Sequence, residues 1–299
     1  MMVPVNIPEY KGLPYPSFLA SELGETDPDQ ALFHVMPVPY EKTVTYGTGT
    51  GKGPSAILMA SQQLELFDGV GIPADRGIFT RAPLNCEGLP ETVLGELSQQ
   101  VEDLMERKKI PVILGGEHTL TAGALQGFGM FERPVGVVQF DAHADLRDTY
   151  EGSPYNHACA MRRVMDHGCD LFQIGVRSMS FDEAIFRREH RIGHLDTVDI
   201  AGSGIPSSIL PDDFPMNIYI SIDVDSLDPS LMPATGTPEP GGLTWFQMVG
   251  ALEKIISRRN VVGFDVVELA PIPGFHFAEF TVARLIYNTM GLISRNLQT

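Results

Sequence analysis

The chain has 299 residues, of which 43% are hydrophobic and 20% charged, and 38 acidic against 21 basic residues give a formal net charge of −17. This composition is typical of a soluble globular protein with a large α/β core, and no apolar run approaches the ~20 residues that a membrane span needs. No Lys/Arg run offers the basic face that nucleic acid requires, whereas an acidic protein favours cationic small molecules and metal ions. We therefore expect neither a nucleic-acid nor a membrane partner.

The cysteines and the N-terminus indicate a reducing compartment. The three cysteines, Cys86, Cys159 and Cys169, are odd in number and have no CxxC spacing, which favours free thiols. The first sixteen residues, MMVPVNIPEYKGLPYP, lack a basic segment followed by an apolar one, so they do not read as a secretory signal. We expect a cytoplasmic protein.

Strand and helix patterns alternate along the chain. Residues 1–30 are Pro-rich and predict an irregular N-terminal arm on the surface or on a neighbouring subunit. The Gly/Thr-rich loop 46–53 lacks the GK[ST] ending of a phosphate-binding loop and is better explained as a turn into a helix with Pro54 in its first turn. The patterns predict strands at 32–38, 77–82, 111–114, 135–140, 171–176, 191–195, 217–224 and 261–267, and helices at 55–67, 91–109, 119 onward, 156–167, 181–189, 244–259 and 278–292.

These elements predict one architecture. About eight strands alternating with helices indicate an α/β fold with a mostly parallel sheet that helices cover on both faces. Thr244 is expected to cap the helix that follows it, with Phe246 and Val249 among its inward residues. No internal boundary or repeat is visible, so we expect a single domain over 1–299.

Polar side chains follow several of the apolar strands. Asp141, His143 and Asp145 come directly after strand 135–140, and in an extended segment residues at i, i+2 and i+4 share one face. The other strand ends carry His118, the pair Asp223 and Asp225, and Glu268. Ligands gather at the carboxyl ends of parallel strands, and buried unpaired carboxylates are strongly unfavourable, so the sequence predicts a metal site.

Six candidate ligands are too many for one tetrahedral zinc. They are His118, Asp141, His143, Asp145, Asp223 and Asp225. Two imidazoles and four carboxylates suit a pair of bridged cations, with Mn²⁺ the natural candidate and iron, cobalt or zinc as alternatives. Two cations about 3.5 Å apart can generate hydroxide from a shared water, which indicates metal-assisted hydrolysis.

Each motif alone has a simpler explanation. Asp and His of a DxHxD also cap turns and helices, the Gly115–Gly116 turn with a helix-capping Glu117 explains GGEH, and Asp228 before Pro229 suits a turn. All three motifs at strand ends, in this order, favour the metal site.

GGEHT (115–119), FDAHADLR (140–147) and SIDVDSLDP (221–229) resemble the signature motifs of the ureohydrolase family of arginases, agmatinases and formimidoylglutamases. The resemblance extends from PYEKTVTYGTGTGKGP near 39 to DVVELAP near 271 and implies the three-layer arginase-like α/β fold with two Mn²⁺ ions. It implies that His118, Asp141, Asp145 and Asp223 hold one ion, and that His143, Asp141, Asp223 and Asp225 hold the other.

The resemblance also assigns roles around the metals. Glu268 would hold the guanidinium fork, a geometry that a carboxylate matches bidentately. Asp145 would orient the nucleophile and carry its proton to the leaving amine. His157 resembles a mobile proton-shuttle histidine, although an ordinary histidine at a helix start is the alternative. The remaining histidines match no motif and are expected to be structural.

The segment after DAHAD bears on the substrate. Asp148, Tyr150 and Glu151 would suit a substrate whose far end is an ammonium, so the chain looks most like an agmatinase, which makes putrescine and urea for polyamine synthesis. N1-aminopropylagmatine would satisfy this pattern equally, and guanidinobutyrate would fit less well unless Arg147 met its carboxylate. Arginine would find little to grip its α-carboxylate.

Three other classes are alternatives. A deacetylase-type amidohydrolase would use one zinc and fewer aspartates, a binuclear phosphohydrolase would need basic groups near the site, and a non-catalytic binding protein would have a defective centre. The family resemblance also suggests a homo-oligomer, a trimer or a hexamer.

Overall fold

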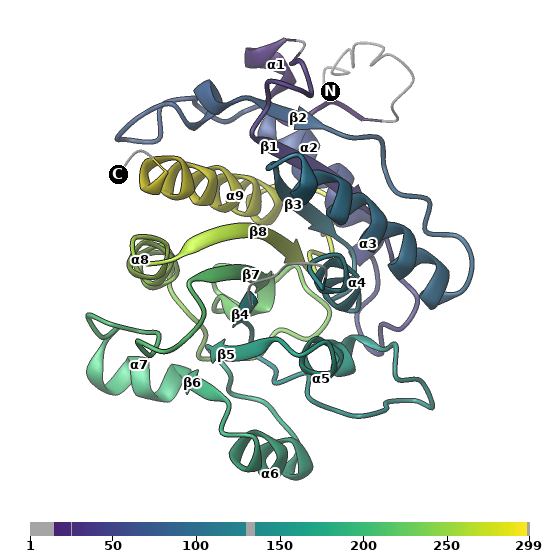
Figure 1. Cartoon of the computed structure of the whole chain (residues 1–299), viewed down its shortest axis with the longest axis vertical. Coiled ribbons are helices and arrows are strands. Elements are labelled where there is room, and N and C mark those ends of the chain that lie inside the picture. Colours follow the sequence, from purple (N-terminus) through teal and green to yellow (C-terminus); the bar gives the residue numbers. More distant parts are fainter. Residues whose placement is uncertain (1–14, 25, 130–134, 298–299) are drawn as a thin grey trace.

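The computed structural model describes residues 15–24, 26–129 and 135–297. Within them one parallel sheet runs in the order β2-β1-β3-β8-β7-β4-β5-β6 (Figure 1). Its eight strands are β1 Phe33–Val38, β2 Ile78–Thr80, β3 Ile110–Gly115, β4 Val135–Phe140, β5 Asp170–Ile174, β6 Gly193–Leu195, β7 Asn217–Asp223 and β8 Asn260–Val267. The predicted α/β fold with a parallel eight-stranded sheet is confirmed.

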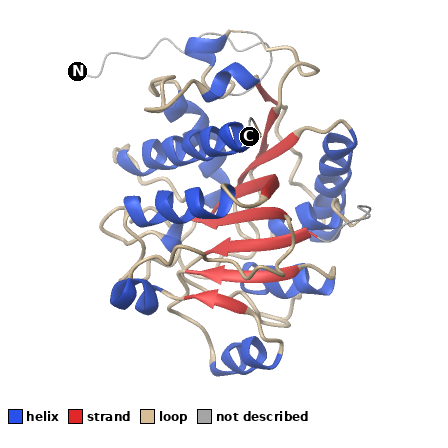
Figure 2. Cartoon of the chain, turned by 60° about the vertical axis from the view of Figure 1, so that its left-hand side comes forward, coloured by secondary structure: helices blue, strands red, loops and turns tan. Residues whose placement is uncertain are grey.

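Helices cover the two faces of this sheet (Figures 1 and 2). The helices are α1 Ala20–Leu23, α2 Gly53–Ser61, α3 Pro90–Glu106, α4 Leu120–Gln126, α5 Ala160–Asp166, α6 Phe181–Glu189, α7 Thr197–Ser203, α8 Trp245–Ile256 and α9 Phe277–Asn296. Helices α3, α4 and α5 pack on one face and α2, α8 and α9 on the other, each over its own apolar cluster. No helix in the described ranges is both long and apolar enough to cross a membrane.

Alternation along the strands builds the two clusters. In β1, Phe33 and Val35 belong to the cluster under α2, α8 and α9, whereas Met36 and Val38 belong to the cluster under α3, α4 and α5. Side chains of a strand point alternately to opposite faces, so a strand that is apolar throughout is buried on both. Strand β1 is therefore covered by helices on both of its faces.

Several element boundaries differ from the prediction. Helix α2 ends at Ser61 rather than near 67, because the Gln62 side chain donates back to the carbonyl oxygen of Leu58 at 2.9 Å. Helix α3 ends at Glu106, and Lys108 then adopts a left-handed conformation (φ 55°) that reverses the chain. The prediction also missed α7, whose N-terminus is held by a capping box of Asp196 and Asp199.

The inward assignment of Phe246 is wrong. This side chain is 85% exposed, and Trp245 of the first turn packs against the core instead. The error arises because Phe246 and Val249 share helical spacing although the apolar stripe of α8 is centred elsewhere. Of the expected N-terminal arm, residues 1–14 lie outside the described residues, and Phe18 and Leu19 are fully buried against the sheet.

Gly116 lets the end of β3 pass between two neighbouring segments. Its amide donates to the carbonyl oxygen of Val38, and its own carbonyl oxygen accepts from the amide of Glu268 at 2.8 Å. A Cβ atom at this position would lie 1.9 Å from the carbonyl oxygen of Tyr40. The second glycine of GGEH is therefore required by close backbone packing at the edge where the site forms.

We expect Gly116→Ala to lower the free energy of unfolding by ~1–3 kcal/mol or more. This is the usual cost of overpacking, and here the added Cβ clashes with the backbone of Tyr40, which cannot rotate away as a side chain could. Gly95→Ala is the matched control, since nothing lies within 4 Å of its added Cβ in α3 and alanine favours a helix by up to about 1 kcal/mol. Denaturant unfolding of both variants measures the difference. Equal stability of Gly116→Ala and wild type would contradict this account of the turn.

Candidate metal centre

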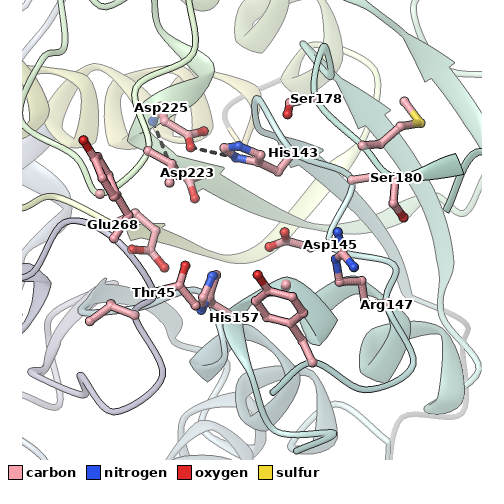
Figure 3. A pocket seen from close by; sticks show the side chains of 18 of the residues that line it. Thr45, His143, Asp145, Arg147, His157, Ser178, Ser180, Asp223, Asp225 and Glu268 are labelled. Carbon is pink, nitrogen blue, oxygen red and sulfur yellow. Dashed lines mark hydrogen bonds and ion pairs between the residues drawn. The ribbon is translucent and has the colours of Figure 1, made fainter. Parts of the chain in front are cut away.

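The six predicted ligands and Glu268 gather at the carboxyl ends of four adjacent central strands. His118 follows β3, Asp141, His143 and Asp145 follow β4, Asp223 ends β7 with Asp225 just beyond it, and Glu268 follows β8. Figure 3 shows His143, Asp145, Asp223, Asp225 and Glu268 of this set around one cavity. Strands β3 and β4 come earlier in the chain, and the later strands β7 and β8 lie between them in the sheet. The site therefore lies where the strand order changes direction.

Two groups of ligand atoms share Asp141. The ligand atoms of His118, Asp141 and Asp145 lie within 4.8 Å of one another, as do those of Asp141, His143 and Asp225. Nδ1 of His118 is 3.1 Å from Asp141 Oδ2 and 3.0 Å from Asp145 Oδ2. Nδ1 of His143 is 3.0 Å from Asp225 Oδ2 and 3.6 Å from Asp141 Oδ1.

Asp223 lies between the two groups. Its Oδ2 is 3.6 Å from His118 Nδ1, and its Oδ1 accepts from the amide of Asp225 at 2.8 Å. All four aspartates are buried. The structure therefore brings together all six predicted ligands.

A hydrogen-bond chain beneath His118 fixes its tautomer. The buried carboxylate of Asp265 accepts from the hydroxyls of Ser221, Thr121 and Tyr219 at 2.8–2.9 Å. Because the Ser221 hydroxyl donates its hydrogen to Asp265, its oxygen accepts from Nε2 of His118 at 2.8 Å. Nε2 thus carries hydrogen and Nδ1 faces the aspartates, an arrangement common behind metal-ligating histidines.

Backbone and amide donors hold the other ligands. The amide of His143 donates to Asp141 Oδ1 at 2.6 Å, and the amide of Ala142 donates to Asp225 Oδ1 at 3.0 Å. Gln139 donates to Asp141 Oδ2 at 2.7 Å and is itself fixed by Gln173. These bonds leave the carboxylates little rotational freedom, so their convergence is built into the fold.

The charges of the site call for a cation. Burial and neighbouring carboxylates raise the pKa of Asp223 well above its ordinary value, and burial also raises the pKa of Asp145. Burial by itself lowers the pKa of an imidazole. Contact with Asp141 and neighbouring aspartates outweighs this effect and raises the pKa of both His118 and His143. The protein alone would hold extra protons here, whereas divalent cations would let all four aspartates ionise. Carboxylate oxygens and imidazole nitrogens suit such cations.

Asp145 and Glu268 adopt left-handed backbone conformations, with φ of 51° and 65°. Such conformations are uncommon for non-glycine residues and persist where the surroundings enforce them. Strand β4 ends at Phe140, so Asp141, His143 and Asp145 do not converge by strand alternation as the sequence suggested. The turn of the chain at Asp145 directs its carboxylate back to His118.

A cavity of about 330 Å³ opens over the aspartates. The predicted site residues His143, Asp145, Asp223, Asp225, Glu268 and His157 line it, together with Arg147, Tyr150 and residues of loops 44–47 and 178–180. Oε1 of Glu268 accepts from the amide of His118 at 2.7 Å, which orients the carboxylate along the wall. Arg147 stacks over Tyr150 and lies 3.7 Å from Glu183.

Asp148 and Glu151, expected from the sequence to suit the ammonium end of a substrate, do not line the cavity. Asp148 forms an ion pair with Arg163 of α5 at 2.7 Å and does not line the cavity. Glu151 occupies a tight turn in which Tyr150 and Ser153 exchange backbone hydrogen bonds, and it lies outside the cavity lining too. Of Asp148, Tyr150 and Glu151, only Tyr150 lines the cavity.

Sequence reasoning also missed Glu117. The simpler explanation of GGEH makes Glu117 a helix cap, but α4 begins at Leu120 and its N-cap residue Thr119 makes no side-chain capping bond. Glu117 is fully buried and instead binds the backbone of residues 42 and 43, at the start of the loop that walls the cavity. An acid beside a predicted ligand was the available signal, but only the fold identifies its partners.

Comparisons with known proteins agree with this geometry. The sequence model described as the arginase family matches residues 31–291. An N(1)-aminopropylagmatine ureohydrolase from Synechocystis sp. is 38% identical over 92% of each chain, and an agmatinase from Pyrococcus horikoshii is 33% identical over 92% of this chain and 96% of its own. The crystal structure of the agmatine ureohydrolase of Thermoplasma volcanium superposes with a TM-score of 0.83 at 28% identity, covering 94% of this chain and 96% of that one.

We expect divalent cations to stabilise the protein, because the clustered aspartates are better paired in the loaded state. At a cation concentration 100 times the dissociation constant the gain is about 2.7 kcal/mol. Thermal unfolding of chelated and Mn²⁺-loaded protein, with metal content measured on the same samples, tests this. Asp141→Asn should lose the gain, whereas Asp170→Asn, an exposed acid at the start of β5, should keep it. A gain that survives in Asp141→Asn would contradict the shared site.

The chelated protein should lose stability as the pH rises from 5 to 8. The raised pKa values of Asp145, Asp223, His118 and His143 mean that the folded protein holds protons that the unfolded chain releases. Each such proton costs about 1.4 kcal/mol per pH unit between the unfolded and the raised folded pKa of its group, a range that begins near 3.8 for the carboxyls and near 6.5 for the histidines. Because cations displace these protons, the difference between loaded and chelated protein should widen with pH. Denaturant titrations at pH 5, 6.5 and 8 measure it, and a constant difference would contradict the prediction.

Proposed function

We propose that this chain, which belongs to the arginase family of ureohydrolases, hydrolyses an unbranched guanidino-amine to urea and an amine, with agmatine and N1-aminopropylagmatine as its candidate substrates. The observation that carries this proposal is the pair of ligand groups sharing Asp141 at the base of a cavity whose wall bears Glu268. Hydrolysis of agmatine would yield putrescine and feed polyamine synthesis.

Enzymes of the arginase family use a binuclear metal centre, and this chain has the residues for one. We assign His118, Asp141, Asp145 and Asp223 to one cation and His143, Asp141, Asp223 and Asp225 to the other. Mn²⁺ is the proposed metal because four carboxylates and two imidazoles suit a borderline-hard ion. When bound, the cations supply Lewis-acid activation of water at neutral pH.

Glu268 is proposed to hold the guanidinium group. The amide of His118 fixes Oε1, so the carboxylate presents its remaining lone pairs to the cavity. A planar guanidinium has paired N–H donors that match a carboxylate edge, which would align the guanidinium carbon above the aspartates. The left-handed backbone at Glu268 contributes to this orientation.

Asp145 and His157 are proposed to move protons. Asp145 Oδ2 faces His118, so Oδ1 is the atom we assign to orienting the attacking water and taking up its proton. The water oxygen bonds to the guanidinium carbon, the bond from that carbon to the alkylated nitrogen breaks, and this nitrogen leaves as the amine after receiving a proton. His157, which lines the same cavity, would relay protons between this nitrogen and solvent.

The nature of the substrate tail is supported by the relatives more than by the cavity wall. The Synechocystis relative is an N(1)-aminopropylagmatine ureohydrolase and the Pyrococcus relative an agmatinase, so both names specify an amine tail. Tyr46 at the mouth is 84% exposed, so a longer tail can extend outward past it. Arg147 is the cation of the outer wall, but Glu183 partly offsets its charge, which weakens the case for a carboxylate tail.

We further propose that residues 1–299 act as one domain of a cytoplasmic homo-oligomer, a trimer or a hexamer. The three unpaired cysteines suit a reducing compartment. Mass photometry of the Mn²⁺-loaded protein would report the oligomer directly.

Urea release by the Mn²⁺-loaded protein from four substrates tests the proposed function. We expect kcat/KM for agmatine or N1-aminopropylagmatine to exceed that for arginine and guanidinobutyrate by at least ~100-fold, about 2.7 kcal/mol. Arginine and guanidinobutyrate carry a carboxylate at the far end, where the two amines have an ammonium or a neutral methylene, so the charge pairing at the outer wall differs. The control is Asp141→Asn, which should release no urea from any of them. A preference for arginine would reject the amine tail, and a preference for guanidinobutyrate would assign the tail to Arg147.

A further inference from the structure

Glu117 is saturated with hydrogen bonds from one loop and one helix start. Its Oε2 accepts from the amides of Lys42 and Thr43, each at 2.6 Å. Its Oε1 accepts from the hydroxyls of Thr43 and Thr119 at 2.6 and 2.7 Å. An ionised carboxylate has about four acceptor sites and no donor, so Glu117 can only accept, and these four donors occupy it.

The hydrogen of the Thr43 hydroxyl is therefore donated to Glu117 and is not available to another acceptor. A hydroxyl has one hydrogen and two lone pairs, and the hydrogen points to Glu117. Two groups of His157 lie against the lone pairs: its amide donates to Thr43 Oγ1 at 3.0 Å, and its Nδ1 lies 3.3 Å from the same atom. For that second contact to be a hydrogen bond, Nδ1 must carry hydrogen.

The ring of His157 is also held from another side. Tyr150 packs edge-on against it, with ring centroids 6.3 Å apart and planes at 85°. Figure 3 shows the imidazole on the cavity wall beside Thr45, on the side where Glu268 lies. Because Nδ1 contacts Thr43, Nε2 is the ring nitrogen that can exchange a proton within the cavity.

We propose that Thr43 and Glu117 are positioning residues that hold neutral His157 in its Nδ1–H tautomer, so that every proton it takes up or releases passes through Nε2. This proposal rests on the proton-relay role given to His157 above. It extends that role to two residues from other segments, since Thr43 belongs to the loop after β1 and Glu117 to the turn before α4. The same turn carries His118, so the metal centre and the proton relay share one support.

The alternative is that these bonds only fasten the loop. The two accounts differ in the hydrogen that Nδ1 carries, which a loop anchor would not need, because the amide of His157 already binds Thr43. They also differ in the effect of removing the hydroxyl while keeping the side-chain shape, which Thr43→Val does. Thr43→Ser restores the hydroxyl.

The first experiment reads the tautomer directly. The protein is labelled with ¹⁵N-histidine and loaded with Zn²⁺, a diamagnetic ion, and the His157 signals are identified among the eight histidines by their absence in His157→Asn. At a pH where His157 is neutral we expect Nδ1 in the protonated range and Nε2 in the unprotonated range. A wild-type spectrum with hydrogen on Nε2 overturns the proposal, whatever reaction the enzyme catalyses.

The second experiment compares Thr43→Val, Thr43→Ser and the control Thr48→Val, an exposed threonine of the same loop that does not line the cavity. We expect Thr43→Val to move hydrogen towards Nε2 and to lower kcat for urea release roughly tenfold to a hundredfold with little change in KM. This loss is no more than the ~10²–10⁴ that a general acid–base contributes, because the relay is displaced rather than removed. Thr43→Ser and Thr48→Val should keep both the tautomer and kcat.

Coupling to His157 separates positioning from loop anchoring. Adding Thr43→Val to His157→Asn should cause no further loss of kcat, because both changes disable one relay. Additive losses, or a slow Thr43→Val enzyme with the wild-type tautomer, overturn the proposal. Absence of urea from every guanidino substrate would instead reject the proposed function while leaving the tautomer measurement intact.

Discussion

The structure depends on gathering Asp141, Asp145, Asp223 and Asp225 at one edge of a largely apolar sheet. Burying like charges together is strongly unfavourable unless positive charge accompanies them. Two imidazoles supply part of it, and the arrangement of ligand atoms into two groups that share Asp141 suits a pair of cations for the rest. The hydrophobic burial of the sheet on both faces is what stabilises the chain enough to hold such a cluster.

Residues that are not predicted ligands hold the ligand side chains in place through hydrogen bonds. Asp265 acts through Ser221 on His118, Gln139 donates to Asp141, and the backbone amide of Ala142 donates to Asp225. Gly116 allows β3 to run close enough to Tyr40 for the turn before His118 to pack. Strained backbone at Asp145 and Glu268 is tolerated because these neighbours over-determine it.

Most of the fold could be predicted, and the failures have physical causes. The predicted strand 135–140 and helix 181–189 have the bounds that the structure shows, because their apolar periods are local properties of the chain. The end of α2 and the exposure of Phe246 depended on tertiary packing, which overrides local periodicity. The sequence cannot show that Asp148 pairs with Arg163 or that Glu151 lies in the turn between Tyr150 and Ser153, so it suggests both as tail-binding residues although neither lines the cavity.

By itself the sequence determined the parallel sheet, the strand ends that carry His118, Asp141 and Asp223, and the ureohydrolase family. It could do so because apolar alternation and the order of motifs are properties of the chain alone. The tertiary structure decided which carboxylates face a cation and which support a loop, a hydroxyl or a helix, as Asp265 and Glu117 illustrate. An acid's role depends on the donors around it, and those donors come from segments distant in sequence that only the folded sheet brings together.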